Sequence, residues 1–290
     1  MQTQQLRTPT SAVWLVLAAI LSVQIGAAFA KSLFGEVTPV AMTWLRACSA
    51  ALLLAAFRPR FAGLTRSDWM TGVGLAACLL GMNWAIYESF ARIPIGLAVT
   101  IEFIGPLGVA LAACRRWKDV TWVVLAAVGV ALLGLGPSTL DVLGVTFALV
   151  AAACWAGYIV LGSRLSPQWS GMSVLFLTYI AGSVLLAGPA IVTSGAALLD
   201  WRVLGLGVAV GLLSSVLPYS LELRALKVIP RRTFGVLMSL EPAAAALAAL
   251  VLLHEVLGAI EWVAIGCVVV AAIGATYSAR IAPPAASVQL

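Results

Sequence analysis

The feature that most constrains the fold is a series of apolar runs, each about as long as a bilayer is thick. Ten such runs follow one another, separated by short connections that carry most of the charged residues and several prolines and glycines. A helix crosses the hydrocarbon core of a bilayer with about 20 residues. We therefore expect an all-α integral membrane protein with ten transmembrane helices near residues 12–30, 40–57, 69–90, 94–114, 120–137, 143–163, 171–193, 203–226, 231–253 and 257–279.

Composition supports a membrane protein. The 290 residues are 62% hydrophobic and 10% charged, whereas about 25% of residues are charged in typical soluble domains. The net charge of +6 is interpreted as a bias of the loops, so nucleic acid is excluded as a partner and membrane lipid is expected. The first run ends in Ala28-Phe29-Ala30, which imitates a signal-peptide cleavage site, but its length favours a retained helix.

The basic residues near the run ends predict the orientation, because Lys and Arg accumulate in cytoplasmic loops. With the N-terminus inside, the outer side receives Lys31, Arg92 and Arg202. The cytoplasmic side receives Arg7, Arg58, Arg60, Arg66, Arg115, Arg116, Lys118, Arg164, Lys227, Arg231, Arg232 and Arg280. Both termini are expected in the cytoplasm.

An internal repeat divides the chain. Pro94 to Pro106 and Pro230 to Pro242 have the same spacing and lie in the fourth and ninth runs. A repeat unit of five helices inserts its second copy upside down, so we expect two inverted halves, residues 1–138 and 139–290. The copies are not equivalent: Glu102 aligns with Met238, and Gly105 with Glu241, which predicts different roles for the two carboxylates.

Charged residues inside the runs are the main functional candidates, since each costs about 2.5–3.5 kcal/mol on insertion scales and should face a cavity or a partner. Glu102 and Glu241 lie nearest the middle of their runs and are predicted to bind a substrate ammonium or to take up a proton. Glu88 lies nearer the outer end. The alternative is an internal ion pair, for which Arg46 is the candidate partner. For Glu222 and Arg224, near an inner end, snorkelling to the interface is favoured.

Prolines and aromatic residues extend this candidate site. Pro106 and Pro242 each remove a helical hydrogen bond and are expected to kink their helices, which is tolerated where the backbone lines a cavity. An aromatic lining would suit a small zwitterion; the alternative for these aromatic residues is ordinary packing or an interfacial belt. The aromatic and polar candidates are Trp84, Tyr87, Trp155, Tyr158, Asn83, Gln24 and Tyr219.

The ten runs, Arg46, the sequence Gly-Leu-Ala-Val-Thr-Ile-Glu-Phe-Ile-Gly-Pro at 96–106 and Ser-Leu-Glu-Pro at 239–242 resemble the drug/metabolite transporter superfamily, in particular its EamA-type branch. Within that branch the 96–106 segment is similar to threonine/homoserine exporters and YddG-like aromatic amino acid exporters. The resemblance implies an inner-membrane carrier that exports amino acids by alternating access, coupled to the proton gradient. It also implies a central cavity between the repeats, to which Glu88, Glu102 and Glu241 would contribute.

Other function classes remain as alternatives. A carrier of the same fold for drug-like cations or nucleotide sugars would need a more acidic or a more basic cavity. A membrane-embedded enzyme would need clustered Asp, His or Cys residues, which the sequence lacks, and a passive channel would lack saturable counterflow. The five cysteines and His254 form no metal-binding pattern, and no metal or other cofactor is expected. The sequence does not define the oligomeric state.

Overall fold

The computed structural model describes residues 10–57, 59, 61–112, 120–133, 141–165 and 169–278, without the side chains of residues 10, 231, 232 and 278. These residues form helices and no strands. The boundary expected at residues 138 and 139 lies outside this part of the chain, as do Cys114 and the cytoplasmic basic residues expected at positions 7, 58, 60, 115, 116, 118 and 280.

The first half of the chain supplies six helical segments. They are α1 (Thr10–Ser32), α2 (Pro39–Ala55), α3 (Arg66–Phe90), α4 (Ile95–Glu102), α5 (Ile104–Ala112) and α6 (Val120–Leu133). The second half supplies α7 (Val142–Gly162), α8 (Gly171–Leu185), α9 (Ala187–Ser194), η2 (Gly195–Leu199), α10 (Trp201–Gly211), η3 (Leu212–Val216), α11 (Leu217–Leu226), α12 (Arg231–Met238), α13 (Glu241–Leu253) and α14 (Ala259–Ser278).

Polar residues define several helix starts. Thr65 caps α3 in a capping box with Asp68, and the side chains of Asp141, Ser170 and Asp200 accept backbone N–H groups at the starts of α7, α8 and α10. Such caps satisfy amide groups that the first helical turn leaves unpaired. These residues interrupt the apolar runs in the sequence, which is why most helix bounds lie within a few residues of the expected ones.

By length and hydropathy, seven helical spans among the described residues can cross a membrane, and eight if α8 and the segment 187–199, which meet at an angle of 48°, count as one bent span. Two further apolar helices, Pro39–Ala55 and Val120–Leu133, are shorter. Large apolar side chains are exposed on the outside of the bundle, for example Val142, Val192 and Trp201. This surface suits lipid, so the chain is a multi-pass membrane protein.

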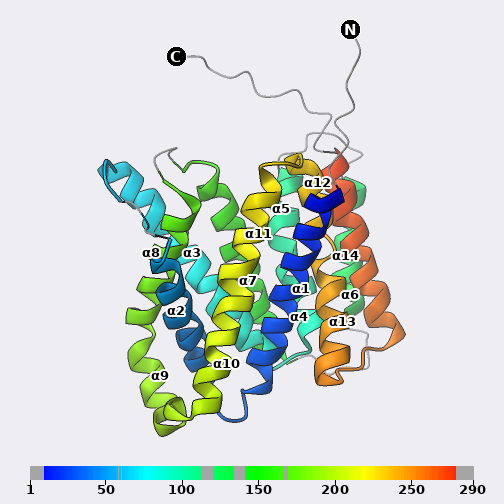
Figure 1. Cartoon of the computed structure of the whole chain (residues 1–290). Coiled ribbons are helices and arrows are strands. Elements are labelled where there is room, and N and C mark those ends of the chain that lie inside the picture. Colours follow the sequence, from blue (N-terminus) through cyan, green and yellow to red (C-terminus); the bar gives the residue numbers. More distant parts are fainter. Residues whose placement is uncertain are drawn as a thin grey trace.

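Two helices are interrupted in the stretches that carry the repeated prolines. The helix from Ile95 breaks at Phe103, and the helix from Arg231 breaks at Ser239 and Leu240. Pro106 and Pro242 follow these breaks by a few residues and have no amide hydrogen for the carbonyls of Glu102 and Met238. In Figure 1, α4 lies below α5 whereas α12 lies above α13, so the two broken helices run in opposite directions.

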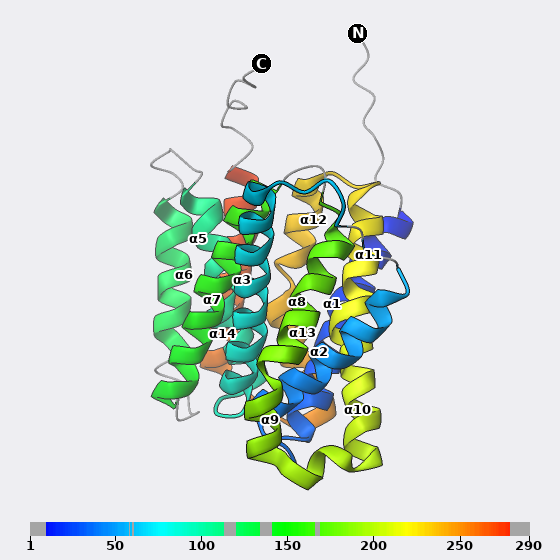
Figure 2. The ribbon, with the colours of Figure 1, turned by 90° about the vertical axis from the view of Figure 1, so that its left-hand side faces the viewer.

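The helices form one bundle (Figures 1 and 2), in which α3 packs on α7, α1 on α11, α6 on α14, and α2 against α8, α9 and α10. The start of α1 and the end of α14 lie at the same end of the bundle, the upper end in Figure 1. We call it the terminal end and the other the distal end. Small residues allow close contacts: a Cβ on Gly96 of α4 would lie 2.7 Å from the Cβ of Ala246 in α13.

Candidate functional site

A cavity of about 510 Å³ lies inside the bundle, between helices of both halves of the chain. Its walls come from α1, α2, α3, α4, α5 and α7 and from η3, α11, α12, α13 and α14. The volume falls within the range of about 300–1,000 Å³ that is typical of small-molecule sites. Apolar and aromatic side chains form most of the lining, and a few charged groups project into it.

The cavity extends toward the terminal end of the bundle. There it reaches Leu226, the last residue of α11, Phe234 near the start of α12, and Thr276 near the end of α14. At its other end it meets Ala27 and Phe90, which are both buried. These buried side chains close the cavity toward the distal end.

Most of the residues singled out in the sequence meet in this cavity, although they come from eight separate helical elements. The lining includes Gln24, Arg46, Asn83, Tyr87, Glu102, Pro106, Trp155, Tyr158, Tyr219 and Glu241.

Three candidates are not among the lining residues: Trp84, Glu88 and Pro242. In α3 the cavity wall is formed by Asn83 and Tyr87, which are one turn apart, whereas Trp84 and Glu88 occupy a neighbouring stripe of the same helix. Trp84 stacks edge-on against Phe147, with ring centroids 5.5 Å apart. Glu88 forms an ion pair with Arg92 at 2.7 Å.

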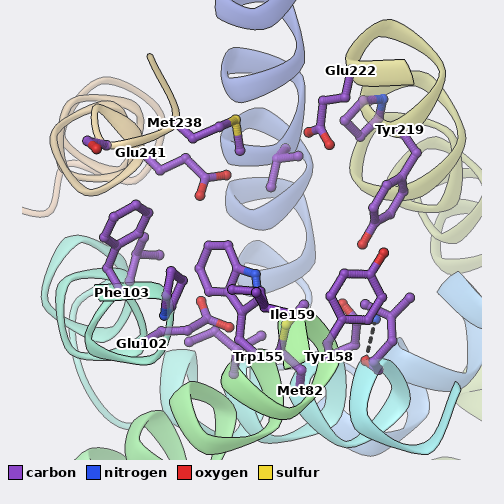
Figure 3. A pocket seen from close by; sticks show the side chains of 18 of the residues that line it. Met82, Glu102, Phe103, Trp155, Tyr158, Ile159, Tyr219, Glu222, Met238 and Glu241 are labelled. Atoms are coloured by element: carbon purple, nitrogen blue, oxygen red, sulfur yellow. Dashed lines mark hydrogen bonds between the residues drawn. The ribbon is translucent and has the colours of Figure 1, made fainter. Parts of the chain in front are cut away.

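Three carboxylates converge on the cavity. Glu102 at the end of α4, Glu241 at the start of α13 and Glu222 in α11 point into the same space, next to Trp155 and to the facing rings of Tyr158 and Tyr219 (Figure 3). None of the three has a hydrogen bond or an ion pair to the residues that the structure describes. Unpaired carboxylates at membrane depth are costly, so the arrangement favours a bound proton or a cationic ligand group.

Glu222 was expected to snorkel to the interface, but it lines the cavity. Snorkelling needs a free path for the side chain to the membrane surface, and α11 instead turns this residue inward, on the same face as Pro218 and Tyr219. The spacing from Pro218 to Glu222, one helical turn, is the sequence signal that would have placed Glu222 beside the other cavity residues.

Arg46 is buried in α2 and also faces the cavity, with 6% of its surface exposed. The alternative of an ion pair between Arg46 and Glu102 or Glu241 is not found: within the described residues no carboxylate oxygen lies within 4.0 Å of its guanidinium. Instead, Nε donates to the hydroxyl of Ser215 at 2.9 Å, Nη2 to the carbonyl of Ser214 at 2.7 Å and Nη1 to the hydroxyl of Tyr87 at 3.3 Å.

Two of these acceptors, Ser214 and Ser215, belong to the π-helical turn η3. Pro218 has no amide hydrogen and so cannot donate to the carbonyl of Ser214, four residues earlier. The amide of Leu217 donates to Leu212, which leaves the carbonyl of Leu213 for the hydroxyl of Ser22 at 2.6 Å. Such turns inside α-helices are frequent at functional sites.

The distal end is closed by contacts between the two halves of the chain. Lys31, at the end of α1, forms an ion pair with Glu255 at 2.6 Å and donates to the carbonyl of Ile93 at 2.9 Å. Glu255 also accepts the amide of Ile95 at 2.9 Å. We call Lys31, Glu255 and the backbone of Ile93 and Ile95 the distal lock.

A helical membrane protein whose mainly apolar cavity holds a few charged groups and is closed toward one end of the bundle belongs to the class of carriers rather than to that of membrane-embedded enzymes with a catalytic cluster at an interface. Comparison with known proteins agrees. The profile of the EamA-like transporter family matches residues 142–277. The chain is 43% identical over 280 residues to the threonine/homoserine exporter RhtA of Escherichia coli K12, covering 92% of this chain and 93% of the relative.

The same exporter from Salmonella typhimurium LT2 is 43% identical over 282 residues, covering 93% of this chain and 94% of the relative. A solved crystal structure superposes with a TM-score of 0.59 at 22% sequence identity, over 93% of this chain and 99% of the other, which concerns the fold alone. The protein is a member of the EamA-like transporter family, within the drug/metabolite transporter superfamily.

Proposed function

We propose that the protein is a secondary carrier that exports small amino acids, among them threonine and homoserine, across the inner membrane. The observation that carries the proposal is the joining of three carboxylates, one guanidinium and an aromatic lining in one cavity. A cavity with both signs of charge is complementary to a zwitterion, and the curated relatives with 43% identity are named as exporters of two such zwitterions.

The proposed architecture is ten transmembrane helices in two inverted repeats, residues 1–138 and 139–290. The helix contacts support it. Under this repeat α1 corresponds to α7, α2 to α8, and α3 to the pair α10 and α11. The packing of α3 on α7 then corresponds to the packing of α11 on α1. The packing of α3 on α8 likewise corresponds to that of α10 on α2. The opposite directions of the broken helices agree with inversion.

We further propose that the terminal end faces the cytoplasm, with both termini on that side. At this end Arg66 begins α3, and Arg164 and Lys227 follow α7 and α11. Lys31, Arg92 and Arg202 are at the other end, which agrees with the bias of basic residues toward cytoplasmic loops. The cavity would then receive substrate from the cytoplasm, as export requires.

Alternating access has a specific basis in the broken helices. At the distal end α4 packs against α13, whereas the described residues of α5 and α12, their counterparts under the repeat, make no comparable contact beside the cavity. Exchanging these two packing arrangements would open the distal lock and close the terminal end. Protonation of Glu102, Glu222 or Glu241 would couple this exchange to the proton gradient.

A carrier for organic cations is a second candidate, because carboxylates outnumber the guanidinium in the cavity. Arg46 argues against it, since a buried positive charge in the wall repels a cationic ligand.

The test is uptake of a panel of labelled amino acids and organic cations into proteoliposomes at two pH values. The proposal predicts saturable uptake of threonine and homoserine that responds to a pH gradient. Uptake of cations without any amino acid would establish the second candidate, and uptake of neither would refute both.

A further inference from the structure

We propose that Arg46 is the carboxylate-binding residue of the cavity, and that the substrates are therefore recognised as zwitterions rather than as amines. This inference rests on the proposed function. It assigns the two charged ends of an amino acid to opposite sides of the site: the carboxylate to Arg46 on α2, and the ammonium to the group of Glu102, Glu222 and Glu241.

The first support is the state of the guanidinium. Arg46 has five N–H donors. Its guanidinium forms three hydrogen bonds, to Tyr87, Ser214 and Ser215. These three acceptors are neutral, so its charge has no anionic partner in the described part of the chain. A buried guanidinium normally pairs with a carboxylate or a phosphate. Here the cavity leaves room for that anion to come from a ligand.

The second support is that the guanidinium is held in place. The carbonyl of Ser214 and the hydroxyl of Ser215 belong to the π-helical turn, and the ring of Tyr87 lies below the guanidinium with its centroid 5.5 Å from Cζ. Groups fixed in this way lose little freedom when a ligand binds. This geometry favours recognition of a planar carboxylate.

The third support comes from unpaired polar atoms in the same wall. The side-chain carbonyl oxygen of Gln24 and the hydroxyl of Ser214 are buried, line the cavity and have no hydrogen-bond partner among the described residues. Buried polar atoms in folded proteins are nearly always satisfied. A polar ligand bound beside Arg46 would supply the missing partners, for example a hydroxyl donor to Gln24.

In a purely structural role, Arg46 would donate a hydrogen bond to the carbonyl of Ser214, which Pro218 leaves without an amide partner. Such a role would need one of its three hydrogen bonds and no charge. The two roles differ in what happens to ligand preference. A structural residue changes the transport of all substrates together, whereas a carboxylate-binding residue changes the discrimination between a carboxylate and its neutral analogue.

The experiment measures competition against labelled threonine exchange in proteoliposomes by L-threonine, by L-threoninamide, which lacks the negative charge, and by 3-hydroxybutyrate, which lacks the ammonium. For the wild type we expect the amide to compete at least about tenfold less well than threonine, equivalent to about 1.4 kcal/mol. Arg46→Gln should lose this preference, and Arg46→Lys should retain part of it because the charge remains.

Arg224→Gln is the matched control, since Arg224 is exposed and does not line the cavity; it should keep the wild-type preference. The inference would be overturned if threoninamide and threonine compete equally well in the wild type, a result that does not depend on the folding of any variant. It would also be overturned if Arg46→Gln keeps the wild-type preference for threonine. In both cases threonine exchange itself would leave the proposed function standing, whereas a wild type that exchanges no amino acid refutes the function and this inference with it.

Discussion

Glu102 and Glu241 face the same cavity but occupy different positions in the repeat, one before a helix break and one after it. We predict that Glu102→Gln and Glu241→Gln each lower amino acid exchange by at least about tenfold, or about 1.4 kcal/mol, and that they alter its dependence on pH differently. The reason is that each substitution fixes as neutral a group that otherwise binds a proton or an ammonium. Initial rates of exchange in proteoliposomes at several pH values measure both effects.

Glu88→Gln is the control for this pair. Glu88 pairs with Arg92 and does not line the cavity, so the apparent affinity and the pH profile should stay close to those of the wild type. If Glu88→Gln matches the two cavity variants, or if both cavity variants transport normally at all pH values, the assignment of the carboxylates is refuted.

His254 ends α13 in the left-handed conformation, with φ 56°. A residue with a Cβ pays about 1–2 kcal/mol for this conformation, and glycine does not. We predict that His254→Gly preserves or raises the thermal stability of the detergent-solubilised protein, and that His254→Val lowers it. Unfolding followed by reaction of a thiol-specific dye with the partly buried cysteines measures the difference, and a stabilising His254→Val would contradict the prediction.

At the scale of helices, a glycine at the contact allows α5, the second part of the first broken helix, to approach α7 closely. A Cβ on Gly105 would lie 2.1 Å from the carbonyl oxygen of Ala152, whereas a Cβ on Gly108 in the same helix meets nothing within 4 Å. We predict that Gly105→Ala costs about 1–3 kcal/mol of stability through overpacking, and that Gly108→Ala is neutral or slightly stabilising. Thermal unfolding of the two variants is the measurement, and equal stabilities would refute the packing argument.

The distal lock is expected to open once in each transport cycle. Replacing Lys31 and Glu255 by cysteine in a background without the native cysteines allows a short thiol cross-linker to hold the lock closed. We predict that cross-linking abolishes exchange and that a cleavable cross-linker restores it after cleavage. A cross-linked protein that exchanges at the uncross-linked rate would show that the distal end does not open.

Among the helical elements, the apolar runs predicted the segments and Pro106 and Pro242 predicted where two of them would be interrupted. The turn η3 was not predicted. A π-helical turn leaves backbone carbonyls that need hydrogen-bond donors from other helices, and here the side chains of Ser22 and Arg46 are these donors. The signal in the sequence was Pro218 inside an apolar run, four residues after a pair of serines. For α3, periodicity separates Asn83 and Tyr87 from Trp84 and Glu88, but only packing decides which stripe faces the cavity.

For the whole molecule, the family and the helical membrane class followed from the sequence, whereas the hydrogen-bond partners inside the site did not. Arg46 was the candidate partner if Glu102 or Glu241 formed an internal ion pair, yet Arg46 is bound by neutral acceptors 168 and 169 residues away in the chain. Contacts between such distant segments have no local signature in one sequence. The proposed orientation remains a prediction.

That orientation is open to a direct test. Fusions of a periplasm-dependent reporter enzyme after residues 35 and 198, at the distal end, should be active, and a fusion after residue 63, at the terminal end, should be inactive. The reverse pattern would place the cavity on the outer side of the membrane and contradict export from the cytoplasm.

The central claim is that the cavity belongs to an amino acid carrier that exposes it to one side of the membrane at a time. Counterflow tests this most directly: proteoliposomes loaded with unlabelled threonine are diluted into a trace of labelled threonine. For a carrier we expect transient accumulation of label above equilibrium, which saturates with substrate and is lost in Glu102→Gln. Label that only equilibrates at a rate independent of internal threonine would indicate a channel, and no movement of label would contradict amino acid transport altogether.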